Sequence, residues 1–236
     1  MSPLRRTAYF GGTFDPVHPG HIGLARAMVA HGYSERVWFA PAFAPPHKRT
    51  RRITPYVHRL NMLMLALRGK PHLEATDFEA QLGLDPSYTY EVMLRLRAAY
   101  PDEQWQLLIG ADSLLELHSW HRAAELVRDF EILTAPRPGI EVSEAVLNQV
   151  WGAEEGRRLY HSVMDLPGFD CSSTKIRKNF TGQVVLPEIQ SYIEMCGLYG
   201  VGNRRREEKL ENRALQIAEA AAKAAIVAAK VNQGFD

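Results

Sequence analysis

Segments with the pattern of short buried strands alternate with segments of helical pattern along most of this 236-residue chain. The expected strands cover residues 7–10, 36–40, 72–76, 104–109, 130–134 and 160–166. The expected helices between them cover 21–31, 59–67, 88–99 and 121–127. Strands and helices that alternate at this spacing predict a parallel sheet with helices on both faces. The chain is therefore predicted to have an α/β fold.

Three loops of this predicted sheet hold most of the residues suited to chemistry. They follow the strands that end at Phe10, Ala40 and Ile109. Because parallel strands end at one edge of their sheet, the three loops are expected to share that edge. Ligands of such sheets bind beyond the carboxyl ends of the strands. We therefore expect one binding site there.

Composition narrows the classes of protein that the chain can belong to. Hydrophobic residues make up 46% and charged residues 23%, which is typical of a folded globular protein. The net charge is only +1, so a nucleic-acid binder, which usually carries a strong basic excess, is disfavoured. Any phosphate site must come from local positive charge. Cys171 and Cys196 stand in no metal-binding pattern.

The two cysteines, the absence of a signal-peptide pattern after Met1 and the absence of a long apolar stretch predict a soluble protein of the reducing cytoplasm, with no membrane partner.

The composition changes near residue 203, which divides the chain into a predicted main domain, 1–202, and a tail, 203–236. The tail opens with the charge run 204–209 and is then rich in alanine. Between Leu210 and Val231, apolar residues (mostly alanine) recur at alternating spacings of four and three. This pattern predicts a helical appendage. It can join copies into a homo-oligomer, or serve as a solvated helix or linker.

The most informative segment is Gly11-Gly12-Thr13-Phe14-Asp15-Pro16-Val17-His18-Pro19-Gly20-His21. Two glycines directly after a strand allow backbone amides to approach a ligand closely. The helix predicted to follow has N–H groups and partial positive charge at its start, which attract phosphate. His18 and His21 are three residues apart and can face one side, either protonated or donating an N–H as neutral rings.

A second segment, Ser172-Ser173-Thr174-Lys175-Ile176-Arg177, has the pattern of a capped helix start. Its hydroxyl and amide groups are suited to an anion, and Arg177 can add a guanidinium one turn into the helix. Taken alone, the segment is equally compatible with an ordinary capped helix.

Together these two segments resemble the motifs of the cytidylyl- and adenylyltransferase superfamily. The first resembles its His-x-Gly-His motif, and the second its Ile-Ser-Ser-Thr-x-Ile-Arg motif, with Cys171 in place of the usual isoleucine. The resemblance implies a dinucleotide-binding-like, Rossmann-type fold whose histidines contact nucleotide phosphates.

Further segments resemble bacterial nicotinate-nucleotide adenylyltransferases over residues 7–200. They are Pro45-Pro46-His47-Lys48, Pro86-Ser87-Tyr88-Thr89-Tyr90-Glu91, Gly110-Ala111-Asp112 and Leu117-His118-Ser119-Trp120-His121-Arg122. Glu91 and Val92 stand where this family usually has Asp and Thr, and Glu91 is expected to cap its helix less well.

This resemblance implies the joining of nicotinate mononucleotide and ATP into nicotinate adenine dinucleotide and pyrophosphate, by direct displacement. The implied catalytic residues are His18, His21, Lys48 and Arg177. The implied ATP contacts are Gly11, Gly12, Thr13, Phe14, His18, His21, Asp112, Ser173, Thr174 and Arg177. The implied acceptor contacts are Lys48, Tyr88, Thr89 and Trp120, whose indole would stack on the pyridine ring. Mg²⁺ is expected as cofactor, held mainly by substrate phosphates and not by a protein metal site.

Alternatives remain open from the sequence. The acceptor could be nicotinamide mononucleotide or phosphopantetheine, because the preference for acid over amide rests on backbone amides near Tyr88 and Thr89. The chain could also be a non-catalytic nucleotide-binding module that assembles through its tail. Lys48 could be a solvated side chain, Asp112 a helix cap and Trp120 a core residue. His118, His121, Arg59 and Arg137 are interpreted as surface or supporting residues.

Overall fold

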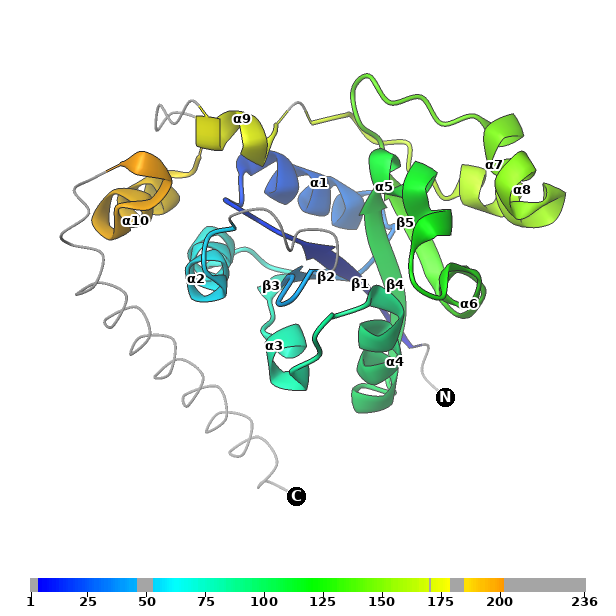
Figure 1. Ribbon diagram of the computed structural model, residues 1–236, viewed down its shortest axis with the longest axis horizontal. Helices are drawn as coiled ribbons and strands as arrows, with labels where there is room; N and C mark the ends of the chain where they lie inside the picture. The colour runs from blue at the N-terminus through cyan, green and yellow to red at the C-terminus, as the bar shows by residue number, and fades with distance from the viewer. Residues whose placement is uncertain (1–3, 46–52, 170, 179–184, 202–236) are drawn as a thin grey trace.

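The structure is a computed structural model that describes residues 4–45, 53–169, 171–178 and 185–201 (Figure 1). Lys48 and the whole predicted tail, 203–236, lie outside the described residues. The described part is built on one five-stranded parallel sheet, which confirms the predicted α/β fold of Rossmann type.

The strands of the sheet lie in the order β3-β2-β1-β4-β5. Their bounds are β1 (Arg5–Gly12), β2 (Arg36–Pro41), β3 (Leu73–Ala75), β4 (Glu103–Gly110) and β5 (Glu131–Ala135). The order reverses between β1 and β4, so their connections leave toward opposite sides and open a crevice at their carboxyl ends.

Helices cover both faces of the sheet (Figure 1). The helices before β5 are α1 (Pro19–Ala30), α2 (Tyr56–Leu67), α3 (Phe78–Leu82), α4 (Thr89–Ala99), α5 (Ala111–Glu116) and α6 (Ala123–Asp129), with the short 3₁₀ helix η2 (Leu117–Ser119) after α5. Those after β5 are α7 (Glu144–Trp151), α8 (Ala153–His161), α9 (Ser173–Lys178) and α10 (Pro187–Cys196), followed by the 3₁₀ helix η3 (Leu198–Gly200). The four helices predicted from the sequence correspond to α1, α2, α4 and α6.

Two hydrophobic clusters lie on the two faces because side chains alternate along each strand. Ala8 of β1 and Val37 and Phe39 of β2 pack against α1, α2 and α10. Tyr9 and Trp38 point to the other face and pack against α4, α5 and α6. Burial on both faces explains why these strands consist of continuous apolar runs.

The strand predicted over 160–166 is wrong. Tyr160 is the penultimate residue of α8, and only Val163 makes a parallel bridge, to Thr134. Two backbone hydrogen bonds hold this segment beside β5, from Thr134 N to Ser162 O at 2.8 Å and from Met164 N to Thr134 O at 2.9 Å. The α8 segment has acidic residues in its first turn and basic ones in its last, which favours a helix. The first two residues of the expected strand, 160 and 161, therefore belong to this helix.

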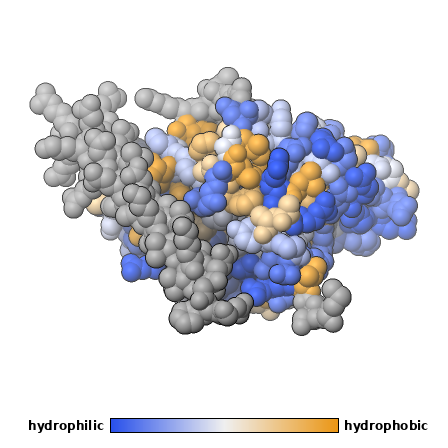
Figure 2. All heavy atoms as spheres, turned by 90° about the horizontal axis from the view of Figure 1, so that it is seen from below, coloured by the Kyte–Doolittle hydropathy of each residue, from blue (hydrophilic) through white to orange (hydrophobic). Residues whose placement is uncertain are grey.

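The surface of the described part is mixed in character. Its exposed large apolar side chains come from several different elements, among them Met64 of α2, Val146 of α7 and Met195 of α10. On the face seen in Figure 2, apolar patches are interrupted by hydrophilic side chains. Within the described ranges, no helix is long and apolar enough to cross a membrane. Cys171 and Cys196 are both free thiols.

Candidate functional site

A cleft opens at the carboxyl ends of β1 and β4, where the strand order reverses. Its volume is about 380 Å³, within the range of roughly 300–1,000 Å³ that is typical of small-molecule sites. The loops after β1, β4 and β5 and the segment before α9 form its walls. The fold therefore places a cavity where parallel sheets usually bind ligands.

Most of the residues that the sequence nominated line this one cleft. They are Gly11, Gly12, Thr13, Phe14, His18, His21, Asp112, Trp120, Ser173, Thr174 and Arg177. They come from parts of the chain up to 166 residues apart, from position 11 to position 177. Of the three loops expected to share the edge of the sheet, those after β1 and β4 contribute directly.

His18 and His21 lie at the start of α1 with their rings stacked, 3.6 Å between ring centres and 15° between ring planes. The His18 backbone N–H donates to Nδ1 of His21 at 3.3 Å. Nδ1 of a neutral His21 is therefore an acceptor, which leaves its proton on Nε2. The ring of His21 also makes edge-to-face contacts with Phe10 and Phe14, with ring centres 5.9 and 5.0 Å apart.

Both histidines are neutral in the free protein. The pKa of His18 is lowered from 6.5 to about 4, chiefly by burial and in smaller part by the charge of Arg137. Burial also lowers the pKa of His21 well below its ordinary value, with added repulsion from His18 and Arg137. Of the two forms open to the sequence, the neutral N–H donor is the one that the structure supports.

The segment around α9 is bonded to the loop between β1 and α1. Ser173 Oγ donates to the carbonyl oxygen of Pro16 at 2.9 Å. Arg177 donates to the carbonyl oxygen of Asp15 at 2.5 Å and to Thr174 Oγ1 at 3.2 Å. Tyr199 OH donates to the Asp15 carboxylate at 2.7 Å. The two motifs, distant in sequence, thus form one wall, and Arg177 retains further N–H groups for an anion.

The backbone of Gly20 passes close to Cys171, which directly precedes the second motif. A methyl group on Gly20 would lie 2.7 Å from Cβ of Cys171 and 3.2 Å from Nδ1 of His18. The first distance is shorter than carbon atoms tolerate, so only glycine fits here without displacement. The glycine of His-x-Gly-His is therefore needed for a steric reason, which the sequence did not reveal.

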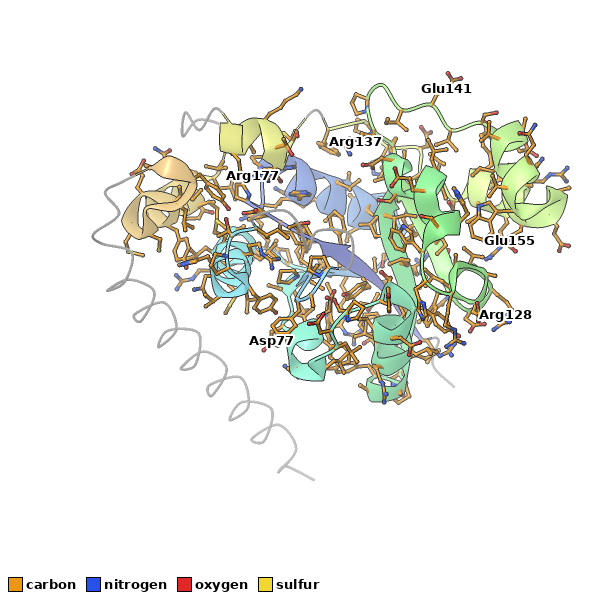
Figure 3. All side chains as sticks on the ribbon, viewed as in Figure 1. Asp77, Arg128, Arg137, Glu141, Glu155 and Arg177 are labelled. Carbon is orange, nitrogen blue, oxygen red and sulfur yellow. The ribbon has the colours of Figure 1, made fainter. Side chains whose placement is uncertain are left out.

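Asp112 and Arg137 form an ion pair across the part of the cleft beyond β4 and β5. Both side chains are about half exposed, which leaves them accessible to a ligand. Figure 3 shows Arg137 and Arg177 on the same side of the sheet, close to the ribbon of α1. Sequence reasoning interpreted Arg137 as a surface or supporting residue and did not nominate it for the site. Its position directly after β5, at the same edge as the other loops, was the signal that could have found it.

The residues nominated for the acceptor nucleotide are less closely grouped. Trp120 lines the cleft, whereas Tyr88 and Thr89 stand at the start of α4 and are not among the lining residues of the described part. Tyr88 stacks on His121, the neighbour of Trp120, with 4.2 Å between ring centres. Glu91, the unusual residue of this motif, forms an ion pair with Arg122 at 3.3 Å. Lys48 lies outside the described residues.

Arg59, interpreted from the sequence as a surface or supporting residue, is buried. Its guanidinium donates to the carbonyl oxygens of Thr54, Thr13 and Ala42, each at 2.9 Å. It thus links the loop after β1 to the loop after β2.

Comparison with known proteins agrees with this architecture. Residues 9–179 match the profile of the cytidylyltransferase-like family, which is more than half of the chain. The chain therefore belongs to the cytidylyltransferase-like family, and the protein is a nucleotidyltransferase.

Within that class the similarity is to nicotinate-nucleotide adenylyltransferases. The chain is 32% identical to the protein of that name from Bacillus subtilis over 203 residues, which cover 83% of this chain and 99% of the relative. It is 36% identical to a probable nicotinate-nucleotide adenylyltransferase from Geobacillus thermodenitrificans over 84% of this chain and 87% of that one.

Solved structures show the same fold. The nicotinic acid mononucleotide adenylyltransferase of Plasmodium falciparum, complexed with NaAD, covers 84% of this chain with a TM-score of 0.68 and 17% identity. A putative nicotinate-nucleotide adenylyltransferase from Vibrio parahaemolyticus covers 83% with a TM-score of 0.56 and 16% identity.

Proposed function

We propose that this protein transfers the adenylyl group of ATP to nicotinate mononucleotide, giving nicotinate adenine dinucleotide and pyrophosphate. One observation carries the proposal. His18 and His21 at the start of α1, Asp112 beyond β4 and Arg177 of α9 converge on a single cleft at the switch point of the sheet. The curated relatives that are 32–36% identical bear the name of this activity.

The proposed reaction needs little covalent chemistry from the protein. The attacking group is the phosphate of the acceptor, which is largely dianionic near neutral pH because its second pKa is about 6. No general base is required, so catalysis consists of aligning the two phosphates and stabilising charge on the leaving pyrophosphate. The N–H groups of His18 and His21 address the α- and β-phosphates, and Arg177 and Lys48 neutralise further charge. Asp112 takes the ribose hydroxyls once Arg137 releases it.

We further propose that Mg²⁺ accompanies ATP. Among the described residues, no three His, Cys, Asp or Glu side chains lie together as a metal site. The ion would be held chiefly by phosphate oxygens and would neutralise part of their charge.

The decisive test is release of pyrophosphate from ATP by the purified protein with each of three acceptors: nicotinate mononucleotide, nicotinamide mononucleotide and phosphopantetheine. We expect the highest kcat/KM with nicotinate mononucleotide. Faster turnover of another acceptor would reassign the substrate, and no release with any of them would favour a non-catalytic binding module.

The variant Trp120→Ala is expected to raise the KM for the acceptor mononucleotide about tenfold or more, with a smaller change in the KM for ATP. The reason is that stacking of a ring on an aromatic side chain contributes about 1–3 kcal/mol. Steady-state kinetics with each substrate varied in turn measure both constants. A defect confined to ATP would place Trp120 in the other half of the cleft, and loss of solubility would indicate a core residue.

For the tail we propose a helix that packs on its own domain or on a second copy and takes no part in chemistry. Only Leu210, Ile217 and Val231 of its apolar stripe are larger than alanine, so the stripe buries little area. Truncation after Gly202 is expected to retain most of kcat, and light scattering shows whether assembly changes. A truncated protein that is folded but inactive would place the tail in the active site.

A further inference from the structure

Glu79 of α3 is a buried carboxylate that the proposed chemistry does not use. Its side chain is 6% exposed and accepts hydrogen bonds from three separate parts of the chain. Tyr9 OH of β1 donates to one carboxylate oxygen. The backbone N–H of Phe43 at 3.0 Å and Ser87 Oγ at 2.9 Å donate to the other. Burial raises the pKa of Glu79, and the hydrogen bonds from these three donors oppose that shift because they favour the carboxylate.

Two of these donors belong to segments that lead to the nominated acceptor contacts. Phe43 lies in the loop after β2, five residues before Lys48, and Ser87 directly precedes Tyr88 and Thr89. The segments also bond to each other, since Ser87 N donates to Ala44 O at 3.2 Å and Ala44 N donates to Ser87 Oγ at 3.4 Å. Glu79 therefore bonds to both segments at the place where they bond to each other.

A buried cation, Arg59, binds the other side of the same peptide group that donates to Glu79. Arg59 donates to the carbonyl oxygen of Ala42, while Glu79 accepts from the amide of Phe43. Arg59 also binds Thr13 O in the loop after β1, so it bonds to a nominated ATP contact as well as to the loop after β2. In the described part of the chain, Glu79 accepts from the segments after β2 and before α4, and its third donor, Tyr9, lies within β1 and not in the loop that follows it. The two buried groups therefore differ in which half of the site they support.

We propose that Glu79 is a positioning residue that holds the loop after β2 and the start of α4 together, and thereby sets the affinity for the acceptor mononucleotide and not that for ATP. This inference rests on the proposed function, because that function nominates Tyr88 and Thr89, which directly follow Ser87, as contacts of the acceptor. Glu79 makes no contact with the reacting groups; it acts through Phe43 and Ser87.

The experiment compares the full-length variants Glu79→Ala and Ser87→Ala with the wild type. Glu79→Ala leaves three donors without their acceptor, and Ser87→Ala removes one of them together with the partner of Ala44 N. We expect the KM for nicotinate mononucleotide to rise about tenfold in Glu79→Ala and severalfold in Ser87→Ala, because one charge-assisted hydrogen bond corresponds to about that factor. The KM for ATP should stay within about twofold.

Glu103→Ala is the matched control. Its carboxylate is also largely buried and accepts from Thr7 Oγ1 and, at 2.8 Å, from Arg36, but it lies at the start of β4, at the opposite end of the sheet from the cleft. We expect this variant to lose thermal stability with both KM values unchanged. All three variants are therefore expected to melt at a lower temperature, but only Glu79→Ala and Ser87→Ala to change in acceptor KM. If a general loss of packing were the cause, Glu103→Ala would raise the acceptor KM as well.

Equal rises in both KM values, or an unchanged acceptor KM in Glu79→Ala, would overturn the inference. If Glu79→Ala does not fold, Ser87→Ala decides in the same way. The proposed function is tested separately by the wild type: if it turns over a different acceptor mononucleotide, the variants are measured with that one, and the predicted split between acceptor and ATP still applies.

Discussion

Replacement of His18 or His21 by alanine is expected to lower kcat about a hundredfold or more while the fold is retained. Each ring presents an N–H group at a phosphate-binding helix start, and loss of one such preorganised donor costs about 3 kcal/mol of transition-state stabilisation. Steady-state release of pyrophosphate at saturating substrates measures the effect, and circular dichroism confirms the fold. A folded variant that turns over like the wild type would remove that histidine from the site.

Replacement of His21 by glutamine is the matched control for His21→Ala. His21→Gln keeps an N–H donor near the position of Nε2, so it is expected to retain more activity than His21→Ala if the neutral ring is the active form. A glutamine variant as slow as alanine would instead require the protonated imidazole.

The pH dependence of stability gives an independent check on His18. Burial lowers the pKa of His18 to about 4 in the folded protein, against about 6.5 in an unfolded chain. Between these values the unfolded state binds more protons, so the free energy of unfolding falls as the pH drops from about 6.5 toward about 4. His18→Gln should reduce this slope in denaturant titrations.

Gly20→Ala is expected to lower kcat/KM by about tenfold or more. The added methyl group would meet Cβ of Cys171 at 2.7 Å, and overpacking of this kind costs about 1–3 kcal/mol. Relief requires the α9 segment to move away from the start of α1, which separates the two motifs that form the phosphate wall. Kinetics with both substrates, together with thermal melting, measure the change.

Two further variants make this prediction specific. In the double variant Gly20→Ala with Cys171→Gly the closest atom is removed, so activity should recover in large part. Gly23→Ala is the control, because its methyl group would meet the edge of the Phe169 ring at 2.6 Å, a side-chain tip that can turn aside. A Gly20→Ala enzyme of normal activity would show that the two motifs need not stay in contact.

Much of the architecture was readable from the sequence because it depends on local patterns. Continuous apolar runs at β1, β2 and β4 are typical of strands buried on both faces, and the structure pairs all three in parallel. The strand expected over 160–166 failed because such a run does not distinguish a strand from the last turn of a helix. There the charge pattern of α8 prevailed.

Some features of the candidate site could likewise be predicted from the sequence, and others could not. The sequence by itself determined which segments carry phosphate-binding groups, since glycines after a strand, histidines at a helix start and capping hydroxyls are local signals. Only the tertiary structure decided that Arg137 faces Asp112, that Gly20 must be glycine beside Cys171, and that Glu79 joins two loops. These properties depend on distances between residues remote in sequence. They arise from packing, which no local pattern encodes.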